Sequence, residues 1–246
     1  MNLLNIIKNN IIDYLYYFFL KNEKLRFIIS NSFIYGEGLE VGALHNPLKV
    51  NKYNTNVKYV DRMNVQDLRK HYPELNNLNL VTIDIIDNGE KLFTISNASQ
   101  DFIIANHMLE HCVNPIKTIE TFLSKLKQGG KIYLSIPDKR FTFDRNRSLT
   151  SFEHLVYDYH ESDTQPQIHH FEEWVEYCEN IDRSSESFSK IVKDRVDLNY
   201  SIHYHVWESE SYLDFLIKTK EFLKNIFSIE VYIQNNDEII SILVKK

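Results

Sequence analysis

Two residues at the ends of predicted neighbouring strands have the types that hold a nucleotide. An apolar run over residues 38–41 closes on Gly42, and a second run over 57–60 closes on Asp61. A glycine lets backbone approach a ligand, and an acid about 20 residues further on accepts both hydroxyls of a ribose. Only one of the usual three loop glycines is present, so two strands joined by a turn at Asn46-Pro47 are the alternative.

Histidines supply a second kind of chemistry, because a neutral imidazole can take a proton from a hydroxyl group. Five of them fall at predicted strand ends or in the region after the fifth strand: His107, His111, His170, His203 and His205. If residues 202–207 form a strand, alternation turns His203, His205 and Trp207 to one side. Such a pair could also bind a divalent metal with Asp138 or Asp144, but a third ligand is not evident and we predict no metal site. A structural role is the alternative for each histidine.

A charged segment after the fifth predicted strand has the composition of an anion site. It contains Lys139, Arg140, Arg145 and Arg147, and guanidinium groups match the geometry of phosphate or carboxylate oxygens. We therefore expect this region to bind an acceptor through a set of five residues: Asp138, Lys139, Arg140, Asp144 and Trp207. A solvated run of charges is an equal alternative.

Composition bounds the class of protein. The 246 residues are 43% hydrophobic and 25% charged, which is typical of one globular domain. The net charge of −6 disfavours binding to nucleic acid. Two cysteines make neither a disulfide framework nor a zinc spacing, so we expect reduced thiols and a cytoplasmic location.

Strands and helices alternate through residue 137. Strands are expected at 38–42, 57–60, 80–86, 100–105 and 131–136, and helices at 65–75 and 114–126. Asn114-Pro115 is a helix start, and Gly129-Gly130 is expected to stop that helix. Two further runs, 228–233 and 238–244, read as an antiparallel hairpin. The pattern predicts an α/β fold with a doubly wound, Rossmann-like, mostly parallel sheet and ligands at the carboxyl ends of its strands.

The remaining segments are expected to flank this sheet. Residues 1–32 form a helical cap on a domain spanning 33–246, with a membrane-surface or dimer helix as the alternative; the apolar stretch 11–20 is too short to span a bilayer. An insert at about 138–208 reads as a lid or acceptor region. Within it, Thr150 and Glu153 fit a capping box, and a helical stripe runs from Phe171 to Cys178.

The order of these motifs resembles the class I S-adenosylmethionine-dependent methyltransferases, in particular the type-11-like branch, from about residue 36 to 137. The resemblance implies S-adenosylmethionine as cofactor. It places Glu40, Gly42 and Ala43 around the methionine part, Asp61 and Arg62 at the ribose, Asp84 on the adenine side, and Asn106 and His107 in a segment that closes over the cofactor. Residues 43–47 depart from the family where two further glycines are usual, so His45 or Asn46 side chains could replace backbone contacts, with a plain Asn-Pro turn as the alternative.

Two later segments, Ile136 to Asp144 and Ile202 to Trp207, resemble bacterial methyltransferases encoded among surface-glycan genes. This resemblance implies O-methylation of a small sugar-like, phosphorylated or nucleotide-linked precursor of a surface polysaccharide. The expected catalytic histidines are His203 and His205 first, with His111 and His170 as further candidates.

Two other classes remain open. A nicotinamide-dependent oxidoreductase shares the glycine loop and the ribose acid, although it normally has the fuller GxGxxG loop. A non-catalytic domain of this fold, serving a glycan-assembly partner through its N-terminal helix, is the other; a homodimer is possible in either case.

Overall fold

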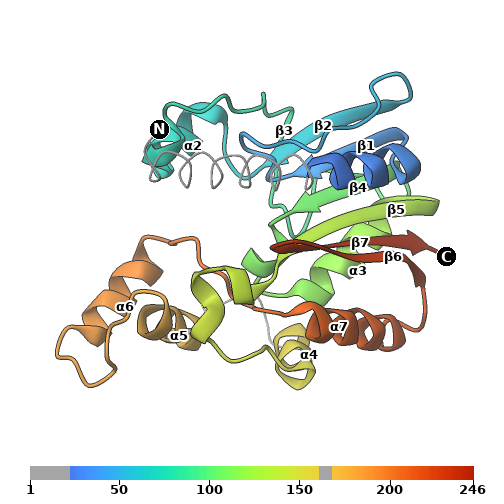
Figure 1. Ribbon diagram of the computed structural model, residues 1–246. Coiled ribbons are helices and arrows are strands. Elements are labelled where there is room, and N and C mark those ends of the chain that lie inside the picture. The colour runs from blue at the N-terminus through green and yellow to red at the C-terminus, as the bar shows by residue number, and fades with distance from the viewer. Residues whose placement is uncertain (1–22, 161–167) are drawn as a thin grey trace, which may run out of the picture.

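The computed structural model describes residues 23–160 and 168–246, and a seven-stranded sheet runs through them (Figure 1). The strands lie in the order β3-β2-β1-β4-β5-β7-β6. Their bounds are β1 Gly36–Val41, β2 Thr55–Asp61, β3 Ile85–Ile86, β4 Gln100–Asn106, β5 Leu126–Pro137, β6 Phe227–Asn235 and β7 Glu238–Lys245. Strands β1 to β5 are parallel, whereas β7 is antiparallel to both β5 and β6. The predicted mostly parallel sheet with a C-terminal hairpin is confirmed.

Helices cover the sheet and continue into the insert. Residues 23–33 are helical. The other helices are α2 Val65–His71, α3 Pro115–Lys125, α4 Phe152–His160, α5 Ile168–Tyr177, α6 Phe188–Asp197 and α7 Ser209–Phe222, with 3₁₀ turns η1 Pro73–Leu75, η2 Leu109–His111, η3 Lys139–Phe141 and η4 Phe143–Asn146. Figure 1 shows α5 and α6 beyond the sheet, on the side of its strand ends.

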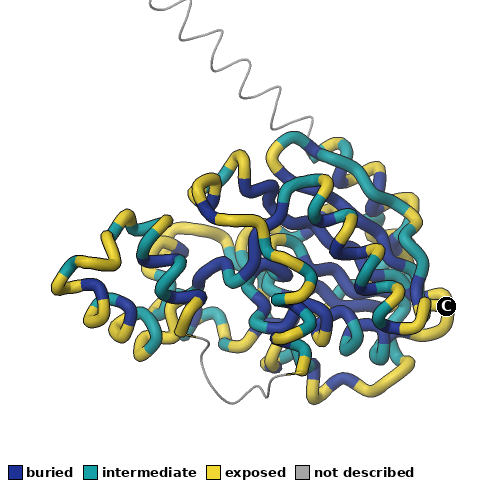
Figure 2. Tube along the Cα trace, turned by 90° about the horizontal axis from the view of Figure 1, so that it is seen from below, coloured by how far each residue is buried: buried dark blue, intermediate teal, exposed yellow. Residues whose placement is uncertain are grey.

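Both faces of the sheet are buried, as expected of parallel strands. On β4, Ile103 and Ala105 join one apolar cluster with α3 and α7, whereas Phe102 and Ile104 join a second with Ile29 of the helix at 23–33. A third cluster, built on Phe171, Trp174, Val175, Phe188, Val192 and Ile202, holds α5 against α6. Figure 2 shows buried backbone along the strands and a smaller buried stretch in this outer helical part.

The helix α3 forms as its sequence predicts. Asn114 accepts a hydrogen bond from the Lys117 amide (2.9 Å), and Pro115 occupies the first turn. Its buried face is Ile116, Ile119, Phe122 and Leu123. The expected stop at Gly129-Gly130 is wrong, because the helix ends at Lys125 and both glycines lie within β5.

Three other local predictions need correction. The third strand is only Ile85–Ile86, shorter than the predicted 80–86, because the Asp84 carboxylate accepts a hydrogen bond from the Tyr59 amide (2.8 Å). The helix predicted at 65–75 ends at His71, and Pro73 begins a separate 3₁₀ turn. The box at Thr150 is not made: its hydroxyl accepts from the Val206 amide, and Ser151 accepts from the His154 amide.

The N-terminal prediction is only partly within the described chain. Residues 1–22, including the apolar stretch 11–20, lie outside it, while the helix at 23–33 packs on the sheet through Ile29. None of the helices within 23–160 and 168–246 combines the length and apolar character that crossing a bilayer requires.

Candidate functional site

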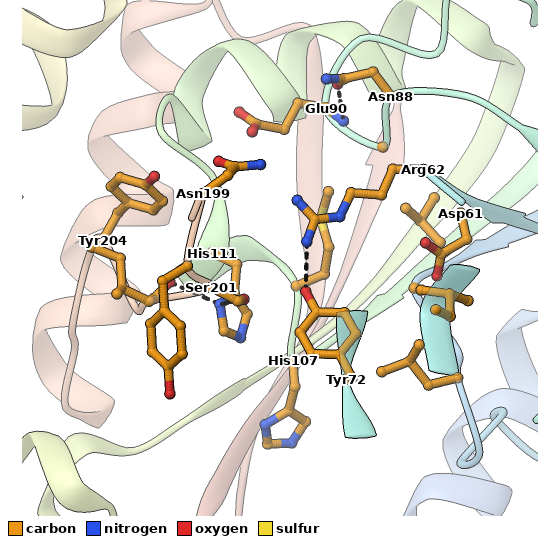
Figure 3. A pocket seen from close by; sticks show the side chains of 18 of the residues that line it. Asp61, Arg62, Tyr72, Asn88, Glu90, His107, His111, Asn199, Ser201 and Tyr204 are labelled. Carbon is orange, nitrogen blue, oxygen red and sulfur yellow. Dashed lines mark hydrogen bonds between the residues drawn. The ribbon is translucent and has the colours of Figure 1, made fainter. Parts of the chain in front are cut away.

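A cavity of about 470 Å³ lies at the carboxyl ends of the parallel strands (Figure 3). Strand ends and the loops after them supply one wall: Val41, Gly42, Asp61, Arg62, Asn88, Gly89, Glu90, His107 and Met108. The facing wall comes from His111, Val113 and the segment after α6, namely Asn199, Tyr200, Ser201, Ile202 and Tyr204. Leu44, Leu68, Tyr72, Glu74 and Leu75 complete the lining. The cavity therefore joins the sheet to the insert.

Gly42 and Asp61, the two predicted nucleotide-binding residues, both line this cavity. Gly42 has φ +69°, and a Cβ atom added there would meet no atom within 4 Å, so the backbone is open toward a ligand. Asp61 is only 8% exposed, and burial raises the pKa of its carboxyl despite hydrogen bonds from the amides of Arg62 and Met63. Next to it, Arg62 Nη2 donates to the Tyr72 hydroxyl (2.7 Å).

His107 also lines the cavity and is held from behind by charged groups. Its Nε2 lies 3.2 Å from Glu238 Oε2, and Glu238 is in turn paired with Arg26. Desolvation opposes the imidazolium, but the hydrogen bond to Glu238 and the charges of Glu110 and Glu238 raise the pKa of His107. Its backbone has φ +48°, an uncommon conformation for a residue with a Cβ atom.

Four predicted cofactor residues do not line the cavity: Glu40, Ala43, Asp84 and Asn106. Glu40 Oε1 accepts from the Leu48 amide (2.8 Å) and from Asn106 Nδ2 (3.3 Å), so this carboxyl fixes the loop that follows Gly42. Burial raises the pKa of Glu40 to about 7. The Asp84 carboxylate accepts a hydrogen bond from the Tyr59 amide of β2. Residues 88–90 occupy the wall where an adenine-side acid was expected.

Of the predicted catalytic histidines, His111 is the one on the cavity wall. Its Nδ1 lies 2.8 Å from the Ile202 carbonyl oxygen, which can only accept. Nδ1 therefore carries the proton of the neutral ring, and Nε2 carries the lone pair. Burial lowers the pKa of His111, with the charge of Glu110 opposing that shift.

His203 lies behind His111, with the two ring centres 4.6 Å apart. Its Nδ1 is 2.6 Å from Asp144 Oδ2, and Arg147 Nη1 donates to the other oxygen of that carboxylate (2.9 Å). Although burial alone would raise it, these partners hold the pKa of Asp144 below its ordinary value. Glu110 is also close, is 1% exposed, and has no hydrogen-bond partner for either carboxylate oxygen among the described residues.

The expectation that His203 and His205 share one side is wrong. Residues 201–206 form no strand, because the Tyr204 and His205 amides both donate to the Glu110 carbonyl. The His205 ring instead meets His154, Asp158 and His170 in a separate buried cluster. Burial lowers the pKa of His205 to about 3 and also lowers that of His154 and His170, so these rings are neutral near pH 7.

The five residues expected to bind an acceptor do not line the cavity. Asp138 is fully buried and is gripped by the Arg140 guanidinium, while Lys139 Nζ donates to the Arg145 carbonyl (3.1 Å). Trp207 is a core residue that bridges to Asp138 through backbone. The Asp144 carboxylate is hydrogen-bonded to Nδ1 of His203.

Sequence reasoning missed most polar residues of the cavity, among them Tyr72, Asn88, Glu90, Asn199, Ser201 and Tyr204. They lie in loops whose paths depend on tertiary contacts. The one available signal was the pair of short polar stretches, 87–90 and 199–204, that flank predicted elements.

Comparisons with known proteins agree with this architecture. Residues 38–190 match the family model described as a methyltransferase domain. A protein from Rhodobacter sphaeroides, named among Zn-dependent alcohol dehydrogenases, is 13% identical with a TM-score of 0.51, covering 89% of this chain and 88% of that one. One from Methanococcus maripaludis, named among S-adenosyl-L-methionine-dependent methyltransferases, is 14% identical with a TM-score of 0.48, covering 93% and 87%.

A third structure, the CurJ carbon methyltransferase, is 12% identical with a TM-score of 0.45; the match covers 87% of this chain and 49% of that one, about half its length. At 13% identity the likeness to the Rhodobacter sphaeroides protein concerns the fold alone. A search among curated proteins gives no match.

Proposed function

The chain belongs to the methyltransferase domain family, and from that membership we propose that it methylates an oxygen atom of a small hydroxylated acceptor. The enzyme is S-adenosylmethionine-dependent, as its family implies. The observation that carries the proposal is one cavity with Gly42 and Asp61 on one wall and His111 on the other. Such a cavity holds a cofactor and an acceptor side by side, which is what direct group transfer needs.

The residues at the strand ends fit this cofactor. Open backbone at Gly42 leaves room for the methionine part, and the Asp61 carboxylate is the acceptor that two ribose hydroxyls require. Leu68, Leu75 and Met108 offer an apolar surface to the adenine ring. When bound, S-adenosylmethionine supplies a methyl group on a positively charged sulfur.

The proton of a hydroxyl acceptor needs a base, and we assign that role to His111. Its Nδ1 is committed to the Ile202 carbonyl, which leaves Nε2 to accept the proton. His203 and Asp144 act as positioning residues, because they support the ring of His111 without lining the cavity. His170 and His205 do not line the cavity and have no part in this step.

The acceptor class rests on residues of the facing wall and on the sequence. Asn199, Ser201 and Tyr204 offer donors and acceptors suited to the hydroxyls of a sugar-like molecule. The segments Ile136 to Asp144 and Ile202 to Trp207, similar to those of surface-glycan methyltransferases, support a precursor of a bacterial surface polysaccharide. The proposal places the enzyme in the cytoplasm, where its two free thiols, Cys112 and Cys178, are stable.

The family match favours this function over a nicotinamide-dependent oxidoreductase. The Rhodobacter sphaeroides protein shares the fold, and at 13% identity the likeness does not extend to its named activity.

The test is transfer to a panel of sugars, sugar phosphates and nucleotide-linked sugars, read by mass spectrometry of the acceptor and by formation of S-adenosylhomocysteine. We expect one compound to gain a single methyl group on oxygen. The His111→Gln variant should bind the cofactor but transfer its methyl group slowly. Transfer exclusively to amines or carbon acceptors would contradict the proposal.

A further inference from the structure

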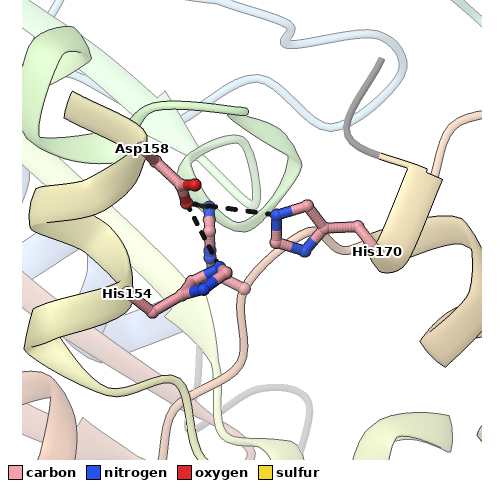
Figure 4. Close-up of side chains that lie close together, drawn as sticks. His154, Asp158 and His170 are labelled. Atoms are coloured by element: carbon pink, nitrogen blue, oxygen red, sulfur yellow. Dashed lines mark ion pairs between the residues drawn. The ribbon is translucent and has the colours of Figure 1, made fainter. Parts of the chain in front are cut away.

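Four side chains from three segments of the insert converge beside the cavity wall. His154 and Asp158 lie one turn apart on α4, His170 lies in the first turn of α5, and His205 lies in the segment after α6. One ligand-type atom from each lies within 4.8 Å of all the others. Figure 4 shows His154 and His170 directed at the Asp158 carboxylate from the two helices.

The distances centre on this carboxylate. Asp158 Oδ2 lies 3.2 Å from His154 Nε2, 3.6 Å from His205 Nε2 and 4.0 Å from His170 Nε2. The ring centres of the three histidines are separated by 5.0, 5.1 and 5.6 Å. Imidazoles bound to one zinc ion at about 2.0–2.1 Å place their ring centres about 5 Å apart, so the rings already stand at the required spacing.

The cluster is buried from solvent. Asp158, His170 and His205 are 2%, 2% and 0% exposed. His205 Nδ1 is buried and has no hydrogen-bond partner among the described residues. A buried polar atom needs a partner, and a bound cation supplies one for this nitrogen.

Nearby charge does not prevent a cation from binding. Arg147 is the buried cation in this region, and its guanidinium is already paired with Asp144 (2.9 Å) and with Glu173 (3.0 Å). A second cavity of about 240 Å³, lined by His154, His170 and Glu173 among others, offers a route for the ion.

We propose that His154, Asp158, His170 and His205 bind one divalent transition-metal ion of the zinc type. Imidazole nitrogens and carboxylate oxygens are both ligands of zinc, and four protein ligands fill a tetrahedral coordination sphere without an open position. The ion joins α4 and α5 to the segment that carries Ser201, Ile202 and Tyr204, and so fixes the wall facing the cofactor residues. Its role is therefore to hold the acceptor side of the cavity in place.

The test measures metal in the untagged, full-length protein after incubation with one equivalent of zinc and desalting. We expect one zinc per chain in the wild type and in the control variant His160→Gln, because His160 is an exposed residue of the same helix. In His170→Gln and His205→Gln, loss of one of four ligands weakens binding by roughly 100-fold or more. Zinc should also raise the melting temperature of the wild type and of His160→Gln, but not of the other two.

A second measurement covers variants that fail to fold. Cobalt bound to the wild-type protein should give the visible absorption of a tetrahedral site, and zinc should displace it. Folded wild type that takes up no metal would overturn the proposal. So would zinc content that survives in folded His170→Gln but disappears in His203→Gln, because the ion would then lie in the cluster of Glu110, His111 and His203.

Discussion

The Nδ1 atom of His203 lies 2.6 Å from Oδ2 of Asp144, and both residues are buried directly behind His111. The carboxylate fixes which ring nitrogen carries the proton, since a carboxylate oxygen can only accept. Asp144→Asn should therefore lower kcat by roughly 10- to 100-fold while the Kd for S-adenosylmethionine stays unchanged.

The control for this variant is Asp138→Asn, which also alters a buried carboxylate held by an arginine, in this case Arg140. Both variants are expected to lose thermal stability, so melting curves accompany the kinetics. Equal losses of kcat in the two would show that Asp144 acts through stability alone.

His111→Gln should reduce kcat by ~10²- to 10⁴-fold, the usual contribution of a general base. Because burial lowers the pKa of His111 from its ordinary value of 6.5, the neutral base persists across neutral pH. The wild-type rate should be level above pH 7 and fall only below pH 6.5, as the ring gains a proton. A stopped assay across pH 5 to 9 with saturating cofactor measures this, and a fall centred above pH 7 would refute the assignment.

Gly42 and Gly129 form a matched pair for testing the cofactor loop. Both have positive φ (+69° and +73°), and a Cβ atom at either would meet nothing within 4 Å. Alanine at each should cost a similar amount of stability, on the order of 1 kcal/mol, because of the backbone conformation. Only Gly42→Ala should also weaken S-adenosylmethionine binding, by calorimetry; equal affinities in the two variants would place the methionine part elsewhere.

Glu40 links the pH dependence of stability to the same loop. Its pKa is raised from 4.5 to about 7 in the folded protein, so the folded state binds the extra proton between these values. The free energy of unfolding should therefore fall as pH rises from 4.5 to 7, by on the order of 3 kcal/mol for this group. Glu40→Gln keeps an oxygen for the Leu48 amide and should remove that part of the slope.

Urea unfolding of both proteins at several pH values in this range measures the difference, since all other titrating groups are shared. Parallel curves for wild type and Glu40→Gln would mean that Glu40 does not hold its proton in the folded state.

The sheet could be predicted from the sequence because its signals are local. Apolar runs mark the strands, and Asn114-Pro115 marks the start of α3. Gly42 and Asp61 followed from that pattern, because the carboxyl ends of parallel strands meet at one edge. The pattern failed at the third strand, where the Asp84 carboxylate binds the Tyr59 amide. It also failed at the end of α2, where Pro73 begins a separate 3₁₀ turn.

The insert could not be predicted in the same way, because tertiary contacts decide where its residues lie. His203 and His205 do not lie on one side, because the Glu110 carbonyl accepts hydrogen bonds from the Tyr204 and His205 amides. The His154 cluster draws on three separate segments, and its one local signal is the four-residue spacing of His154 and Asp158 on a helix. That spacing places both side chains on one face and is worth searching for in related sequences.

The most direct test of the account is isothermal calorimetry of S-adenosylmethionine and S-adenosylhomocysteine with wild type, Asp61→Asn and the control Asp84→Asn. The wild type should bind one molecule of each. Asp61→Asn should lose ~2–4 kcal/mol, about 30- to 1000-fold in Kd, because the ribose hydroxyls lose a charged partner. Asp84→Asn should bind as the wild type does, since its carboxylate faces β2 and not the cavity. Absence of binding to both compounds by folded wild type, or unchanged affinity in folded Asp61→Asn, would contradict the account.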